Sequence, residues 1–362
     1  MMVPDEFAGV AAQWLAAAAR SGSRLERYAV LFLPGGSGDW ADSGIPVTSG
    51  QQITLLAQGQ IWLSREADLR FGPNVTLWYR VGRGLIARSR GNGATVTAIE
   101  PGTISLIAKP PGEWANRHGD FLPDYPHSGA GGGLLVAVLV WNGPVDEGLE
   151  VYAAHGGGTV AEAELARRRA ERPLPRGWEP LWRIGETGMF WESAADDGHE
   201  AITCRCCNDA AILKYPVDME LDESLQLDWS WRIRRIPSRI PEDSLPGHDY
   251  VSVAIEFDNG QDLTYLWSCS LPVGTAFRCP IPWWDRHETH IVARSGPSGL
   301  GLWTDESKLI LADYLRHVGG EAPQRVVGVW LISLSPFQRA VAEWDCRRIE
   351  LRRAGKTLRI GP

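Results

Sequence analysis

Between Leu225 and Ile233, apolar and polar side chains alternate without interruption. In an extended strand, alternate side chains point to opposite faces, so this run places Trp229 and Trp231 on one face and Arg232 on the other. The run from Val251 to Phe257 alternates in the same way. Similar short runs recur along the chain between turn residues, which include 40 glycines and 24 prolines. The sequence therefore predicts strands buried on one face, stacked as antiparallel sandwiches.

The pattern changes at two places along the chain. Phe7, Val10 and Trp14 have helical spacing, and an Ala-, Glu- and Arg-rich run after Thr159 ends before Pro173. We expect an N-terminal helix (residues 1–26), a β-sandwich (27–157), a helical linker (158–176) and a larger β-sandwich (177–362). The predicted fold class is all-β, with two antiparallel β-sandwich or jelly-roll domains joined by a helical linker.

Charge and composition exclude several classes of protein. The 362 residues include 36 Lys and Arg against 44 Asp and Glu, so the net charge of −8 argues against binding to nucleic acid or to an anionic membrane. No apolar run is long enough to span a bilayer, and Asp5 and Glu6 lie where a secretory signal would be basic. The six cysteines all lie in the second half, unlike a disulfide scaffold. We expect a cytoplasmic protein.

The first half carries motifs at residues 40–45, 49–54 and 59–62. With them, residues 28–145 resemble the galactophilic bacterial lectin family, whose members bind galactosides through calcium held by a D-x-P-G-x-x-x-N-N loop. In the matching stretch Lys109 replaces the carboxylate and Arg117 replaces an amide, while Asn116 is retained. Calcium prefers several oxygen ligands, so the resemblance implies a lectin-like scaffold that has lost calcium. A domain kept for packing or assembly is the favoured alternative to a working sugar site.

The second half carries W-x-W-R at residues 229–232, an acidic strand entry at 249–253 and L-x-Y-x-W at 263–267. Trp303 with Glu306, and Asp313 with Tyr314, fit further W-x-x-E and D-Y positions. Residues 180–352 thus resemble the bacterial family known as domain of unknown function 3047. The resemblance implies a β-sandwich and no particular activity. His248 with Asp249 departs from the usual Asp-Asp pair of that family, and residues 335–338 depart from its acidic, Thr-rich segment.

Seventeen tryptophans suggest a partly wet aromatic cleft, because each indole brings an N–H that needs a partner. Such clefts hold sugar rings, aromatic substrates or cations. The candidate ligand-binding residues are Trp229, Trp231, Arg232, Glu256, Trp267, Trp303, Glu306 and Asp313. The alternative is that these tryptophans simply fill the core.

Asp249 and His248 precede a strand at a loop end, where sandwich proteins tend to place sites, and they are the candidate general acid and base. Tyr265 is the third candidate catalytic residue, as a hydrogen-bond donor. Asp228, Arg232 and Glu256 would form a carboxylate–guanidinium cluster if their strands paired, or else a solvated outer face.

Metal signals are weak. In the run 285–290, a strand would place Glu288 and His290 on one face, so a third ligand must come from elsewhere. Cys204 and Cys206 share a face but lack a second pair at zinc-ribbon spacing. We therefore expect no metal site and no cofactor, with calcium disfavoured by Lys109 and Arg117.

These observations favour a bacterial-type protein that binds a small ring-bearing ligand, a saccharide or an aromatic compound, in a Trp-lined cleft of the second sandwich. One alternative is a metal-independent lyase, hydrolase or isomerase that uses Asp249 or His248 as general acid–base. The other is an assembly protein, in which the first domain provides a surface for homo-oligomers.

Overall fold

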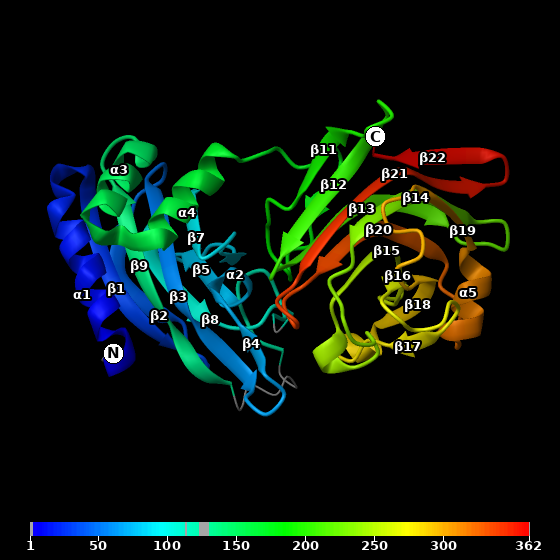
Figure 1. Ribbon diagram of the computed structural model, residues 1–362, viewed down its shortest axis with the longest axis horizontal. Helices are drawn as coiled ribbons and strands as arrows, with labels where there is room; N and C mark the ends of the chain where they lie inside the picture. Colours follow the sequence, from blue (N-terminus) through cyan, green and yellow to red (C-terminus); the bar gives the residue numbers. More distant parts are fainter. Residues whose placement is uncertain (1–2, 113, 123–129, 362) are drawn as a thin grey trace. The chain divides into compact units, whose positions relative to one another are not determined.

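The computed structural model describes residues 3–112, 114–122 and 130–361, and the chain divides into two compact units. The first unit comprises residues up to Glu171 together with Trp182–Glu186, and the second comprises Arg172–Leu181 and the chain from Thr187 onward. Strands dominate both units, and a helix opens the chain, so the predicted β-rich fold is confirmed (Figure 1). Within the described residues, no helix is long and apolar enough to cross a membrane.

Two sheets form the first unit. One has the order β1-β9-β3-β4 with β7 beside β3, and the other has the order β2-β8-β5-β6. Their strands are β1 (Leu25–Pro34), β2 (Ala41–Val47), β3 (Gln52–Ser64), β4 (Leu69–Phe71), β5 (Leu77–Val81), β6 (Ala87–Arg88), β7 (Gly93–Thr97), β8 (Gly102–Ala108) and β9 (Gly131–Trp141). A short helix, α2 (Pro73–Thr76), precedes β5. The core between the sheets includes Leu55, Leu106 and Val138.

Strand β9 is buried on both faces. Val136 and Val138 belong to the core between the sheets, whereas Leu135, Ala137 and Leu139 belong to a second core beneath the helices. A strand that is covered on both faces has a continuous apolar sequence rather than an alternating one, and this explains the sequence of β9.

The helices α1 (Asp5–Arg20), α3 (Val145–Tyr152) and α4 (Gly158–Arg169) contribute to this second core, and a kinked segment at Ala153–Gly157 joins the last two. Trp14 of α1 and Leu149 of α3 are buried there. Helix α4 lies where a linker was expected. Its Ala161 and Leu165 are buried in the core of the first unit, so this helix is a packed part of that unit.

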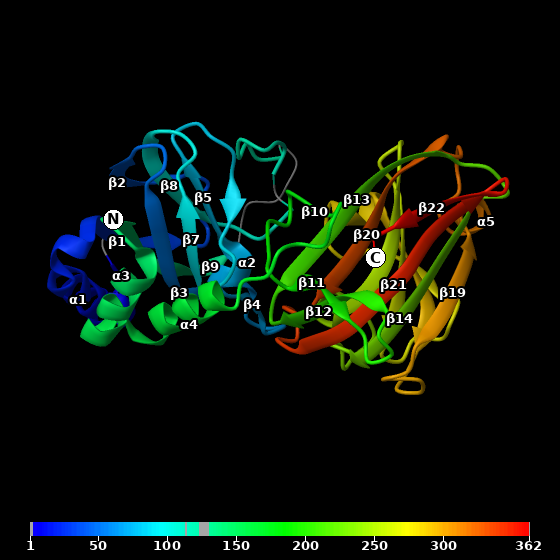
Figure 2. The ribbon, with the colours of Figure 1, turned by 90° about the horizontal axis from the view of Figure 1, so that it is seen from above.

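The second unit is a sandwich of two larger sheets (Figure 2). Sheet I has the order β10-β13-β20-β15-β16-β18-β17, and sheet II has the order β11-β12-β21-β14-β19 with β22 beside β21. Their strands are β10 (Glu179–Pro180), β11 (Phe190–Ala194), β12 (Glu200–Cys207), β13 (Ala210–Glu220), β14 (Gln226–Arg235), β15 (Tyr250–Phe257), β16 (Asp262–Ser268), β17 (Ala276–Arg278), β18 (Glu288–Ser295), β19 (Thr304–Leu309), β20 (Arg325–Leu334), β21 (Val341–Arg353) and β22 (Lys356–Ile360). Helix α5 (Ile310–His317) and two short 3-10 turns, η3 (Leu245–Gly247) and η4 (Trp284–Arg286), complete the unit.

One strand pair in sheet I is parallel. Strand β18 lies between β16 and β17 and runs parallel to β16. Parallel neighbours need a long crossover connection, and here residues 269–287 provide it, with β17 and η4 inside it. This connection brings residues that are far apart in the sequence together on the outer face of sheet I.

Candidate functional site

The predicted aromatic residues of the second unit lie in the core between its two sheets. Trp229, Trp231, Trp267 and Tyr265 are at most 1% exposed. The ring centroids of Trp229 and Tyr265, and those of Trp231 and Trp267, lie 5.6 Å apart. Their burial favours the alternative that these residues fill the core, and the hydrophobic area they bury stabilises the sandwich.

Three predicted residues meet near one edge of this core. The Tyr265 hydroxyl donates to an Asp313 carboxylate oxygen at 2.9 Å. The Lys308 ammonium lies 5.8 Å from the Tyr265 ring and 3.7 Å from Glu306. Glu306 also accepts from the Arg294 guanidinium. Burial, and to a lesser extent the charge of Asp313, raises the pKa of Tyr265 well above its usual value. This hydroxyl therefore stays a hydrogen-bond donor.

The cluster of Asp228, Arg232 and Glu256 does not form, because their strands belong to different sheets. Strand β14 pairs with β19 and β21, whereas β15 pairs with β16 and β20. Glu256 instead lies on sheet I, 2.7 Å from the Lys214 ammonium. Asp228 accepts from Arg352 at 2.6 Å.

Arg232 lies on the outer face of sheet II, in a row of paired residues. Trp191 of β11 is opposite Thr203, Thr203 is opposite Asp345, and Asp345 is opposite Arg232. Asp345 accepts from Thr203 at 2.8 Å and from Arg232 at 2.8 Å. Trp303 lies at one end of this row, with the guanidinium of Arg232 5.0 Å from its ring centroid.

Trp303 is also stacked against a second arginine. The Arg347 guanidinium lies 3.8 Å from the Trp303 ring centroid and pairs with Asp197 at 2.7 Å. Both Trp191 and Trp303 are half-buried, in contrast to the core tryptophans. The outer face of sheet II thus presents two partly exposed indoles with charged, planar side chains between them.

Asp249 and His248, the predicted acid and base, are fully buried. The Asp249 carboxylate accepts backbone N–H groups of Phe337 at 2.9 Å and Gln338 at 2.7 Å, which ties the start of β15 to the β20–β21 connection. Burial raises the pKa of Asp249 to about 7 against these hydrogen bonds. No substrate reaches a fully buried carboxyl directly, so the geometry supports an anchoring role.

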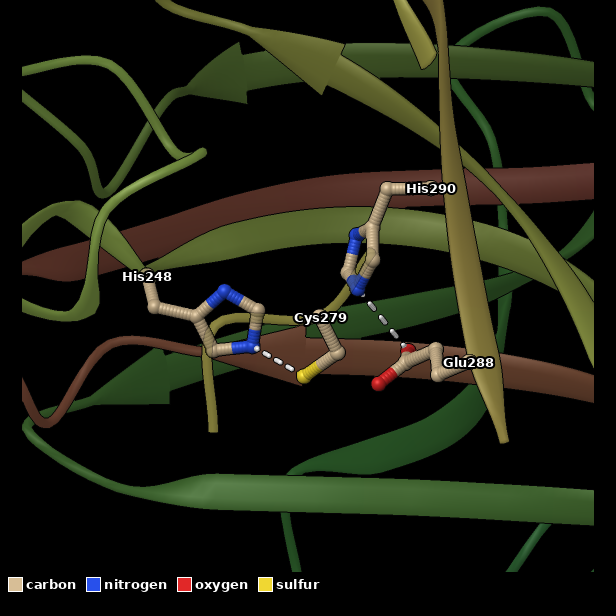
Figure 3. A group of neighbouring side chains, drawn as sticks. All are labelled: His248, Cys279, Glu288 and His290. Carbon is tan, nitrogen blue, oxygen red and sulfur yellow. Dashed lines mark hydrogen bonds and ion pairs between the residues drawn. The ribbon is translucent and has the colours of Figure 1, made fainter. Parts of the chain in front are cut away.

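His248 takes part in a buried group of potential metal ligands with Cys279, Glu288 and His290 (Figure 3). One ligand atom from each residue lies within 4.8 Å of all the others. His248 Nε2 lies 3.4 Å from Cys279 Sγ, and His290 Nε2 lies 3.3 Å from Glu288 Oε1. The group lies on the outer face of sheet I, because the neighbouring β18 residue Ile291 points into the core.

Neighbouring side chains orient this group. The hydroxyls of Tyr250 and Thr264 donate to Glu288 Oε1 at 3.0 and 3.1 Å. Burial, assisted by His290, lowers the pKa of His248 to about 3, so its imidazole is neutral. Burial opposes ionisation of Glu288, but the His290 imidazole, 3.3 Å from Glu288 Oε1, outweighs it and holds the pKa of this carboxyl below its usual range.

Sequence reasoning recognised that Glu288 and His290 share a face but did not find their partners. Cys279 follows β17, and His248 precedes β15, so both come from connections rather than from the same strand. No spacing signal in the sequence links them, and only the parallel crossover brings Cys279 beside β18.

In the first unit, the loop that matches the lectin calcium loop contains cations and stacked rings. The Trp114 ring stacks with those of Trp40, at 5.6 Å, and Phe121, at 5.1 Å. Lys109 is buried, with its ammonium 5.3 Å from the Phe121 ring. Asn116, the retained amide, donates to Asp120 at 2.7 Å. Glu113 lies outside the described residues.

Comparison with known proteins supports the resemblance of the second half. Residues 176–350 match the model of a family described as Protein of unknown function (DUF3047). No curated protein is similar enough to count as a match.

Three solved structures are similar to parts of the chain. The EclA N-terminal domain, a PllA-like lectin, is 17% identical with a TM-score of 0.24, over 31% of this chain and 94% of that one. The xyloglucanase domain of NopAA from Sinorhizobium fredii, solved with cellobiose, is 8% identical with a TM-score of 0.28, over 45% and 86%. The CBM22 tandem domain of Xyn10C from Paenibacillus barcinonensis is 8% identical with a TM-score of 0.22, over 84% and 80%.

Proposed function

We propose that the second unit binds an uncharged saccharide along the outer face of sheet II. The observation that carries this proposal is the row from Trp191 to Trp303, with Thr203, Asp345 and Arg232 between the two indoles. Three strand spacings separate Trp191 from Arg232, about 14 Å, which suits a short oligosaccharide.

The chemistry of the face fits a sugar better than an ion. An indole face packs against the apolar C–H face of a pyranose ring, and planar carboxylate and guanidinium groups hydrogen-bond to hydroxyls. Most charges beside the row are paired. The guanidiniums of Arg232, Arg234 and Arg347 lie against the carboxylates of Asp196, Asp197 and Asp345, and the Arg172 guanidinium lies 4.3 Å from the Trp191 ring centroid. Paired charges of this kind give little net attraction to an ionic ligand.

Beside the row, Asp196 is 84% exposed and pairs with Arg232 at 2.6 Å, whereas the side chains of Arg232 and Asp345 are 8% and 2% exposed. Asp196 is therefore the carboxylate that a ligand hydroxyl would reach, and the buried Arg232 and Asp345 hold the row in place. This face, formed by residues outside the core, replaces the cleft expected between Trp229, Trp231 and Trp267.

The test is affinity electrophoresis of the full chain in gels containing xyloglucan, galactan or hydroxyethylcellulose. We expect at least one polysaccharide to retard the wild type, and Trp303→Ala to abolish that retardation. Loss of about 60 Å² of indole contact costs about 1.5 kcal/mol, a tenfold weaker affinity.

Trp62→Ala is the matched control, because Trp62 is also half-buried and also has guanidiniums over its ring, those of Arg65 and Arg70, but lies in the first unit. This variant should migrate like the wild type. The proposal fails if none of the three polysaccharides retards the wild type, or if Trp303→Ala is retarded as strongly as the wild type.

A further inference from the structure

We propose that the second unit binds one zinc ion through His248, Cys279, Glu288 and His290, and that this ion fastens two long connections to the outer face of sheet I. The connections are residues 236–249, which lead into β15, and residues 269–287, the crossover between β16 and β18. The site uses a different sheet from the saccharide face, so each proposal stands or fails by its own experiment.

The distances between the ligand atoms fit a tetrahedral ion. Zinc–nitrogen and zinc–sulfur bonds of about 2.0–2.3 Å place neighbouring ligand atoms roughly 3.3–3.8 Å apart at tetrahedral angles. Two of the pairs, His248 Nε2 with Cys279 Sγ and His290 Nε2 with Glu288 Oε1, are separated by 3.4 and 3.3 Å. All four ligand atoms lie within 4.8 Å of one another, so small rotations close the site.

The donor set selects the metal. A thiolate with two imidazoles suits zinc, whereas magnesium and calcium prefer oxygen ligands. A dication bound to one cysteinate and one carboxylate forms a neutral unit, as a buried site requires. All four residues are at most 4% exposed, and four protein ligands leave no open position. These features are typical of a structural zinc site.

The surrounding hydrogen bonds orient the metal-ligating atoms toward one another. His248 Nδ1 lies 3.4 Å from the Glu242 carbonyl oxygen, and a proton donated there leaves the Nε2 lone pair facing Cys279. Metal-binding histidines commonly donate their second nitrogen in this way. His290 is fully buried; its Nε2 lies 3.3 Å from Glu288 Oε1, and its Nδ1 makes no hydrogen bond within the described residues. A metal ion accounts for this otherwise costly burial of a polar ring.

The ion would hold the two connections against each other. His248 and Cys279 come from different connections, while Glu288 and His290 come from β18 itself. Between Cys279 and Glu288, Trp283 adopts a φ of 76°, a left-handed backbone that a bulky side chain rarely adopts. Such a conformation persists only where the surrounding structure fixes it, and a metal bond at either end of the segment would do so.

The test is the metal content of the full chain, purified from zinc-supplemented culture without chelators. We expect one zinc per chain by native and inductively coupled plasma mass spectrometry, and a lower melting temperature after chelation that added zinc restores. Cys279→Ser and His290→Gln should lose the zinc. Cys207→Ser and His287→Gln are the controls, because both residues lie outside the cluster, and they should keep it.

Cobalt binding by the wild type tests the proposal even if a ligand variant folds poorly. Metal-stripped wild type should bind one cobalt ion and show a thiolate-to-cobalt charge-transfer band. The proposal is overturned if the purified protein contains no zinc and the stripped protein binds neither zinc nor cobalt. It is equally overturned if Cys279→Ser and His290→Gln bind zinc as tightly as the wild type.

Discussion

Asp345 is the residue whose replacement should cost the second unit most among its ion pairs. Its carboxylate is 2% exposed and accepts from Thr203, from Arg232 at 2.8 Å and from Arg234 at 2.7 Å. Asp345→Ala removes the carboxylate that accepts from all three of these side chains. It also leaves the buried Arg232 guanidinium with Asp196, a carboxylate that is largely in water.

Breaking a buried ion pair by removing one partner costs about 3–5 kcal/mol. For a unit of this size, each kcal/mol shifts the melting temperature by about 2–4 °C, so we expect a fall of roughly 6–20 °C. Glu220→Ala is the control, since Glu220 pairs with Arg353 at 2.7 Å in the same unit but is mostly exposed. Its loss should cost about 0–1 kcal/mol.

Scanning calorimetry of the full chain measures both variants, with the affected transition assigned to the second unit. A fall for Asp345→Ala no larger than that for Glu220→Ala would show that the carboxylate is not a buried anchor of sheet II. The row on which the saccharide proposal rests would then lose its central residue.

Three further outcomes are expected. Tyr250→Phe removes a hydroxyl that orients Glu288, so zinc affinity in a chelator competition should fall about 10–100-fold while the fold is kept. Burial raises the pKa of Cys204 to about 12, so the unfolded chain loses this proton first and the unfolding free energy should fall above pH 9. Urea titrations of Cys204→Ala should show a shallower fall, by up to about 1.4 kcal/mol per pH unit, and an equal slope would contradict this reasoning. Calcium should not change the melting temperature of the wild type, because Lys109 and Arg117 replace oxygen ligands; a calcium-dependent shift would reverse this conclusion.

Much of the fold could be predicted from local patterns. Alternation in β14 correctly placed Trp229 and Trp231 on the inner face and Arg232 on the outer face. Side-chain direction in a strand depends only on its period of two, so it can be read without knowing the neighbours. The same rule placed Glu288 and His290 on one face of their strand.

Strand pairing could not be predicted in the same way. Asp228 and Glu256 were candidates for one cluster, but their strands lie in different sheets, and no local pattern specifies which strands pair. Cys279 was missed for the same reason. It lies in a connection, and its place beside His290 depends on a parallel crossover that antiparallel expectations did not include.

The double burial of β9 removes the usual cue that fixes how a strand aligns with its neighbours. A one-residue slip normally turns apolar side chains to water, but in β9 it would exchange one apolar layer for another. Alignment must therefore be enforced by shape and by the few polar contacts at its end. Trp141 supplies one, since its indole N–H donates to the Thr54 hydroxyl at 2.7 Å, and that hydroxyl contacts Thr95. A chain lacking this contact would have little to distinguish the native alignment from its nearest misfolded competitor.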